Sequence, residues 1–115
     1  MSWKKMNVAP VNEGVPNKFA WEYEESLAAG GNGESVILPD EIIGFAVTVE
    51  FTGGGTGYIS TTTDSISNVK AGTCTWVTWD LGTVGTTKQD YARPVTAIRM
   101  TQVAAGTMKM TCRAQ

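Results

Sequence analysis

Apolar side chains recur at every second position over long parts of this chain. The clearest example is the segment 45–52, in which Phe45, Val47, Val49 and Phe51 alternate with Ala, Thr and Glu. Successive side chains of a β-strand point to opposite faces of a sheet, so this spacing predicts a strand with one buried and one exposed face. No long segment shows the three-and-four spacing of an amphipathic helix. The alternation therefore predicts an all-β protein.

Further strands are marked by the same alternation or by runs of β-branched and aromatic residues. They cover residues 19–24, 35–38, 58–62, 74–81, 94–103 and 107–112. Two pairs of strands are each separated by a glycine-containing turn, and each pair is expected to form a hairpin. These pairs are 45–52 with 58–62 and 94–103 with 107–112. About eight short strands with closely spaced turns predict a two-sheet antiparallel β-sandwich.

The first 17 residues differ from the rest because they contain Pro10, Gly14 and Pro16 and show no sustained period. Proline fixes φ and donates no backbone hydrogen bond, so this stretch is expected to be extended rather than helical or central in a sheet. The predicted organisation is an extended N-terminal arm, residues 1–17, followed by a β-sandwich domain, residues 18–115.

The segment 63–72 predicts a single helical turn. Asp64 or Ser65 could cap its beginning, and Gly72 could end it. Ile66 and Val69 lie three residues apart, so both are expected to plug one end of the sandwich.

The strand 74–81 contains two tryptophans, Trp76 and Trp79. In one unbroken strand, residues three apart face opposite ways, so a bulge or a break is expected between them. An aromatic platform formed by Trp21, Trp76 and Trp79 could stack on sugars. The alternation around each of them favours a place in the core instead.

Length and charge exclude several classes of function. The chain has 115 residues, the size of one domain, and its formal net charge is -2. Without a basic surplus, the counterion release that drives nucleic-acid binding would be weak, so no nucleic-acid partner is expected. No apolar run is long enough for a membrane span or a signal peptide, which predicts a protein made and retained in the cytoplasm of its host cell.

The residue types offer little catalytic chemistry. There is no histidine, which removes Ser-His-Asp and Cys-His arrangements and the commonest zinc ligand. Glu22 and Glu24 have the spacing of a carboxylate pair, but their alternation with aromatic residues favours a solvated face. We therefore expect no enzyme activity and no cofactor.

Metal and disulfide sites are also weakly indicated. Asp64, Asp80 and Asp90 lie near predicted turns and could gather around calcium, but they lack the spacing of a calcium loop. No metal site is expected. Cys74 and Cys112 are expected to be small buried apolar residues, and a disulfide would require their strands to be neighbours.

The N-terminal arm contains the candidate binding residues, Trp3, Lys4, Lys5 and Met6. We expect no core to be available to Trp3 there. An aromatic side chain with basic neighbours on an arm can anchor in a partner's pocket. The alternative is a frayed terminus without function.

Several segments of the C-terminal half resemble small virion structural proteins of tailed bacteriophages, in particular jelly-roll decoration, or cement, proteins. The segments are 61–65, 71–79, 94–99 and 105–107, so that the resemblance covers roughly residues 56–115. It implies a jelly-roll-like sandwich in the virion that binds the outer head surface across capsomer joints. The implied partners are the major capsid protein or other virion proteins and further copies of the chain, without a cofactor.

Two alternatives to a decoration protein remain at this level. One is another virion part of similar build, such as a tail-tip, fibre-base or head-to-tail adaptor domain. The other is a carbohydrate-binding β-sandwich that uses exposed tryptophans.

Overall fold

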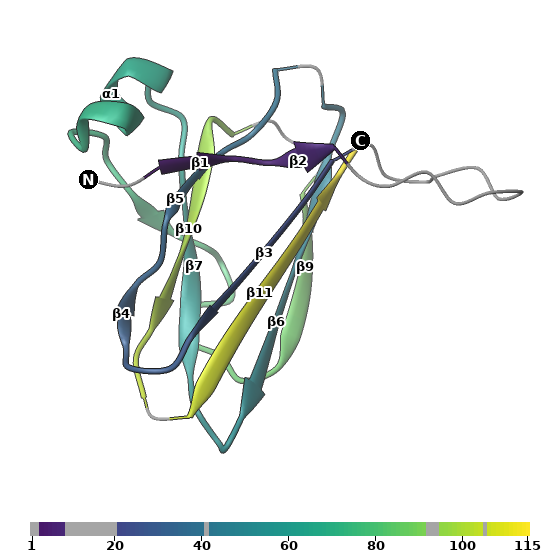
Figure 1. The fold of residues 1–115 in the computed structure, drawn as a ribbon, viewed down its shortest axis with the longest axis vertical. Coiled ribbons are helices and arrows are strands. Elements are labelled where there is room, and N and C mark those ends of the chain that lie inside the picture. Colours follow the sequence, from purple (N-terminus) through teal and green to yellow (C-terminus); the bar gives the residue numbers. More distant parts are fainter. Residues whose placement is uncertain (1–2, 9–20, 41, 92–94, 105) are drawn as a thin grey trace, which may run out of the picture.

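Two β-sheets pack face to face, and one short helix lies beside them (Figure 1). The computed structural model describes residues 3–8, 21–40, 42–91, 95–104 and 106–115. The predicted all-β sandwich is confirmed. Among the described residues, no helix is long and apolar enough to cross a membrane.

The first sheet has six strands. Its order is β1 (Trp3–Lys5), β5 (Ser35–Ile37), β10 (Ala97–Gln102), β7 (Gly57–Thr62) and β8 (Val77–Thr78), and β4 (Gly31–Asn32) also pairs with β10. The second sheet has five strands in the order β2 (Asn7–Val8), β3 (Trp21–Leu27), β11 (Thr107–Ala114), β6 (Phe45–Thr52) and β9 (Thr87–Tyr91). The pair β1–β5 is parallel, and the other pairs of named strands are antiparallel.

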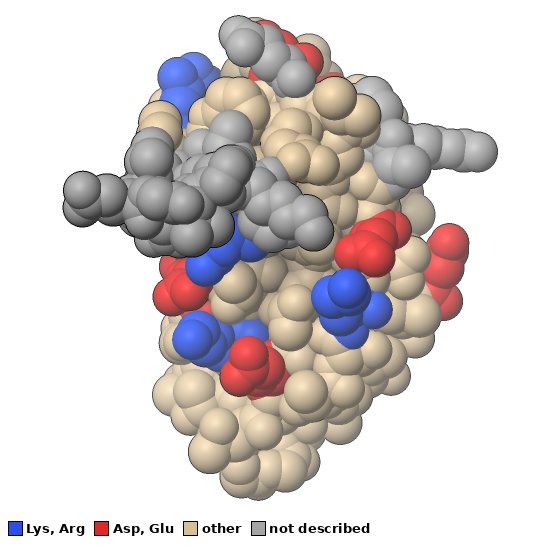
Figure 2. Space-filling model, turned by 90° about the vertical axis from the view of Figure 1, so that its right-hand side faces the viewer, with Lys and Arg blue, Asp and Glu red and all other residues tan. Residues whose placement is uncertain are grey.

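The main core lies between the two sheets, where the predicted alternation puts it. Val47 and Val49 of β6 and Met108 and Met110 of β11 are fully buried. They share the core with residues of the first sheet such as Ile59, Val36, Ile98 and Met100. The intervening residues of the second sheet face outward, and Figure 2 shows acidic and basic side chains interspersed on that side of the molecule.

Neither of the two expected hairpins forms. β6 lies in the second sheet and β7 in the first, and the same is true of β11 and β10. Instead, β6 pairs with β11 and β7 with β10. Alternation specifies which face of a strand is buried, but it does not specify which strand lies beside it. Here the apolar faces of successive strands meet across the core rather than side by side.

The two crossings between the sheets are matched in length. Thr52 pairs with Thr107 in the second sheet, and Gly57 pairs with Gln102 in the first. The two connecting segments, from Thr52 to Gly57 and from Gln102 to Thr107, therefore have the same number of residues. Segments 45–62 and 97–114 therefore form one long antiparallel ribbon that is bent over the core (Figure 1).

Close packing at this bend requires glycine at two positions. A Cβ atom on Gly57 would lie 2.5 Å from the Thr101 carbonyl oxygen and 2.7 Å from the Met108 sulfur. Gly106 has a positive φ of 89°, and a Cβ atom there would lie 2.5 Å from the Thr52 carbonyl oxygen. The glycine-containing turns from which hairpins were expected instead allow two segments of the chain to cross between the sheets in close contact.

The predicted helical turn is confirmed as α1 (Ile66–Ala71). The Ser65 hydroxyl oxygen accepts a hydrogen bond from the Asn68 N–H at 3.2 Å, and Gly72 ends the helix in the left-handed region. Val69 is buried in a small second cluster with Ile37, Ala97, Cys74 and Trp76, whereas Ile66 is 38% exposed. Only Val69 therefore fulfils the expected packing role.

The break between the two tryptophans is also present, because β8 contains only Val77 and Thr78. Trp79 is buried in the main core, and its indole N–H donates to the Gly82 carbonyl oxygen at 2.6 Å. Trp76 packs against the second cluster, with the Arg99 guanidinium 4.6 Å from its ring centroid. The two indoles thus belong to different clusters.

Candidate interaction site

The described N-terminal residues, 3–8, form a strap that joins the edges of both sheets (Figure 1). β1 runs parallel to β5, with Trp3 beside Ser35, and β2 runs antiparallel to β3, with Val8 beside Trp21. Met6 lies between β1 and β2, is 8% exposed and belongs to the main core. The strap is extended, as expected. It contributes Met6 to the main core, whereas Trp3 belongs to neither core cluster of the described residues. Residues 9–17 of the expected arm lie outside the described residues.

The four sequence-predicted binding residues divide into two groups. Trp3 is 36% exposed, and Lys4 and Lys5 are exposed beside it. The ammonium group of Lys70 in α1 lies 4.3 Å from the centroid of the Trp3 ring, a cation–π contact that holds the indole against the helix. Met6 is buried, so it stabilises the strap and is not available on the surface to a partner.

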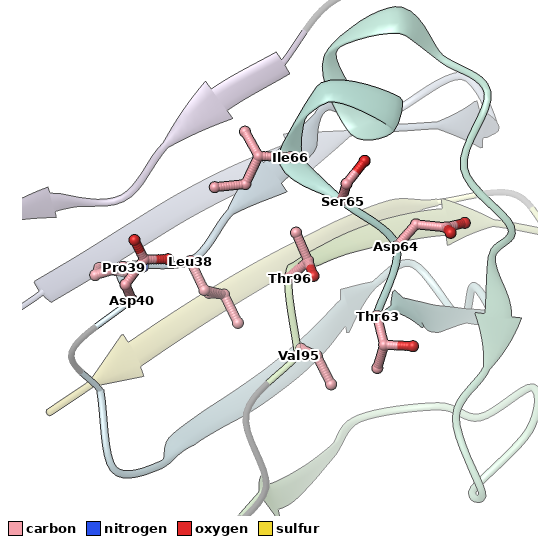
Figure 3. A pocket seen from close by; sticks show the side chains of 9 residues that line it. All are labelled: Leu38, Pro39, Asp40, Thr63, Asp64, Ser65, Ile66, Val95 and Thr96. Atoms are coloured by element: carbon pink, nitrogen blue, oxygen red, sulfur yellow. The ribbon is translucent and has the colours of Figure 1, made fainter.

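A hollow of about 420 Å³ lies near the strap, at the end of the sandwich where α1 begins. Figure 3 shows its lining, which comes from the end of β5, the segment leading into α1 and the segment leading into β10. The lining residues are Leu38, Pro39, Asp40, Thr63, Asp64, Ser65, Ile66, Val95 and Thr96. The walls are therefore partly apolar and partly hydroxyl and carboxylate.

A second hollow of about 330 Å³ adjoins the first and connects it with the strap. Leu38, Pro39, Asp40 and Ile66 line both hollows, and Lys5 and Met6 of the strap line the second. Ile66, which is 38% exposed, thus stands at their common boundary. We call the exposed residues Trp3, Lys4, Lys5 and Ile66, together with the two hollows, the strap-end surface.

Asp64, which lines the first hollow, serves the local fold. The Asp64 carboxylate accepts a hydrogen bond from the Thr75 N–H at 2.6 Å and so fixes the loop after α1. Asp90, which was also considered as a calcium ligand, forms an ion pair with Lys88 at 3.6 Å. Within the part of the chain that the structure describes, no three Cys, Asp or Glu side chains are grouped as metal ligands.

The carboxylate pair on β3 faces solvent, as the alternation predicted. The Arg113 guanidinium lies 3.5 Å from both the Glu22 and the Glu24 carboxylates on the outer face of the second sheet. Glu25 lies on the other side of the strand and accepts hydrogen bonds from the Glu34 N–H and from the Tyr23 hydroxyl. Burial, reinforced by Glu25, raises the pKa of Tyr23 above its ordinary value.

The lining residues of the first hollow that the sequence reasoning missed come from three distant segments. They are Leu38–Asp40, Ile66 and Val95–Thr96. Pro39 indicates the end of a strand, and the cap at Ser65 indicates the beginning of a helix. Neither signal predicts that these two places lie close together in the fold. No protein-family model, no curated protein and no solved structure matches the chain.

Proposed function

We propose that this chain is a virion structural protein of a tailed bacteriophage that binds the outer head surface and stabilises contacts between capsomers. The partner would be the major capsid protein or another virion protein, and no cofactor is involved. The sandwich fold and the resemblance of residues 56–115 both support this proposal. The observation that carries it is the strap-end surface, which gathers an exposed indole, the exposed Ile66 side chain and lysines at one end of the molecule.

The chemistry of that surface suits protein binding. Large aromatic side chains next to a hollow contribute most of the binding energy in many interfaces, and a charged rim adds selectivity. Trp3 and Ile66 provide the apolar contacts, and Lys4 and Lys5 provide the rim. On a shell of repeating subunits, many copies of one modest contact act together and stiffen the whole.

Purified protein added to phage heads that lack it tests the proposal. We expect saturation at a number of copies set by the capsid symmetry, together with greater resistance of the heads to heat. Trp3→Ala and Ile66→Ser should each weaken binding about tenfold or more, as expected for central contacts. Val103→Ser is the matched control, because Val103 is 59% exposed and follows β10 at the bent-ribbon end of the sandwich.

The outcomes separate the alternatives. Uptake at a single vertex of each head would support a tail or adaptor location in place of decoration. Absence of uptake, or equal binding by the Trp3 and Ile66 variants and the wild type, would contradict the proposal.

The carbohydrate-binding alternative is disfavoured by the tryptophans. Trp79 is 5% exposed, and Trp76 lies against Arg99, so the two do not form one open platform. Titration with a panel of oligosaccharides should leave the tryptophan fluorescence unchanged. A saturable change with any of them would favour this alternative.

A further inference from the structure

The strand β9 forms one edge of the second sheet. Its five residues, Thr87–Tyr91, pair with β6 on one side, and among the described residues no strand pairs with them on the other. The backbone N–H and C=O groups that point away from β6 can pair with another strand. Such an edge is a docking surface for an extended segment of matching side-chain pattern.

The charges on β9 select which segment would match. Lys88 and Asp90 flank Gln89 and are 60% and 71% exposed, with their charged groups 3.6 Å apart. We propose that the occupant is β9 of a second copy of this chain, paired antiparallel about a twofold axis at Gln89. In that register, Lys88 of each copy faces Asp90 of the other, and Thr87 faces Tyr91.

Charged residues on an edge strand often serve to prevent pairing. Whether they do so here depends on the signs of the charges that face each other in the pair. Like charges would meet and repel in a symmetric pair, whereas charges of opposite sign on either side of the axis attract. The pattern Lys88–Gln89–Asp90 is self-complementary in this sense.

The other edges among the described residues fit a second copy less well. β2 covers only Glu22 and Trp21 of β3. Symmetric pairing of the rest of that strand about Glu25 would bring two carboxylates face to face. β8 has two residues, and β1 has three with two adjacent lysines, so each offers a shorter or like-charged edge.

The proposed dimer would join two five-stranded sheets into one continuous sheet. Five residue pairs and two reciprocal ion pairs make a small interface, so the isolated dimer should be weak. Copies held close together on a common surface would pair far more readily, because their effective concentration is high. The inference concerns the isolated protein, so it can fail or hold independently of the proposed head binding.

Sedimentation over a wide concentration range tests this inference. The wild type should pass from monomer to dimer, and Lys88→Glu and Asp90→Lys should each raise the dissociation constant about tenfold or more by placing like charges opposite each other. A mixture of these two variants should form a heterodimer, because an acidic edge then meets a basic one. The double variant K88E/D90K should also dimerise, since its charges are exchanged but still complementary.

Lys109→Glu is the control, because it makes the same charge change on the central strand β11 and should leave the dimer intact. Circular dichroism checks that each variant is folded. A wild type that stays monomeric at every concentration, single variants that dimerise like the wild type, or a mixture without heterodimer would each overturn the inference.

Discussion

Gln102 shows how one buried polar side chain can hold two separate turns. It is 3% exposed, its side-chain N–H donates to the Gly106 carbonyl oxygen at 2.6 Å, and its carbonyl oxygen accepts from the Gly30 N–H at 2.9 Å. These bonds join the turn after β3 to the crossing before β11. A buried polar group is stabilising only when it is paired, and here both of its ends are.

Gln102→Leu should therefore lower the free energy of unfolding by about 1–3 kcal/mol, because it removes the hydrogen bonds to the Gly30 N–H and to the Gly106 carbonyl. Urea denaturation measures the change. Thr107→Ala, at an exposed position close to the same crossing, should shift the midpoint very little. A Gln102→Leu variant as stable as the wild type would show that these hydrogen bonds make no net contribution to the free energy of unfolding.

The buried thiol of Cys112 predicts a loss of stability in alkali. Burial raises the pKa of this thiol to about 12 from an ordinary value of 9.0. Between these values, the unfolded state releases the proton and the folded state keeps it, so stability falls as the pH rises. The slope from this one group approaches about 1.4 kcal/mol per pH unit.

Cys112→Ala should reduce that slope, although the smaller side chain also lowers the stability at neutral pH. Urea unfolding at intervals from pH 8 to pH 11 provides the comparison. Some slope should remain in the variant, because burial also raises the pKa of Tyr91, to about 12. Parallel pH profiles for the two proteins would contradict the assignment to Cys112.

At the scale of elements, the sequence predicts the strands better than their partners. The alternation in 45–52 identifies β6 and its buried face correctly. Ser65 marks the beginning of α1, and Gly72 marks its end. The pairing of β6 with β11 could not be predicted, because glycine turns permit both a hairpin and a crossing between sheets. The difference depends on packing between segments far apart in the chain.

The candidate site was predictable to a similar degree. Trp3 and its lysines are at the surface, as the composition of the N-terminal segment indicated. The burial of Met6 could not be predicted, because a single apolar residue in a segment without a sustained period does not indicate a buried face. The hollows could not be predicted, since their walls come from separate segments.

Deleting residues 1–8 should leave the sandwich folded but less stable. Both parts of the strap lie at sheet edges, so the central strand pairs survive, while the burial of Met6 and the edge hydrogen bonds are lost. We expect the free energy of unfolding to fall by about 2–4 kcal/mol, with Met6→Ala alone accounting for about 2 kcal/mol. The proposed binding to heads should also weaken, because Trp3 is removed.

Thermal denaturation of the truncated and full-length proteins checks the stability effect. Trp3→Ala is the control that separates binding from stability. It removes the exposed indole but keeps Met6 in the core. Complete unfolding of the truncated chain would mean that the sandwich cannot fold without the strap.

At the scale of the whole molecule, nearly every pairing joins segments that are distant in sequence. β11, close to the C-terminus, lies between β3 and β6, and β10 lies between β5 and β7. Neither sheet can be completed until the last part of the chain is in place. Had the two hairpins formed, much of the pairing would have been local.

This topology predicts slow folding without early local pairing. Domains dominated by long-range strand pairs fold in about milliseconds to seconds, because loop closure must precede the contacts that reward it. Stopped-flow tryptophan fluorescence should give a main refolding phase in that range, reporting the burial of Trp79. A peptide of residues 45–62 should show no hairpin by NMR, since β6 and β7 have their partners elsewhere in the chain. Microsecond refolding, or a hairpin in the isolated peptide, would mean that local pairing directs folding and that the bent ribbon forms by later rearrangement.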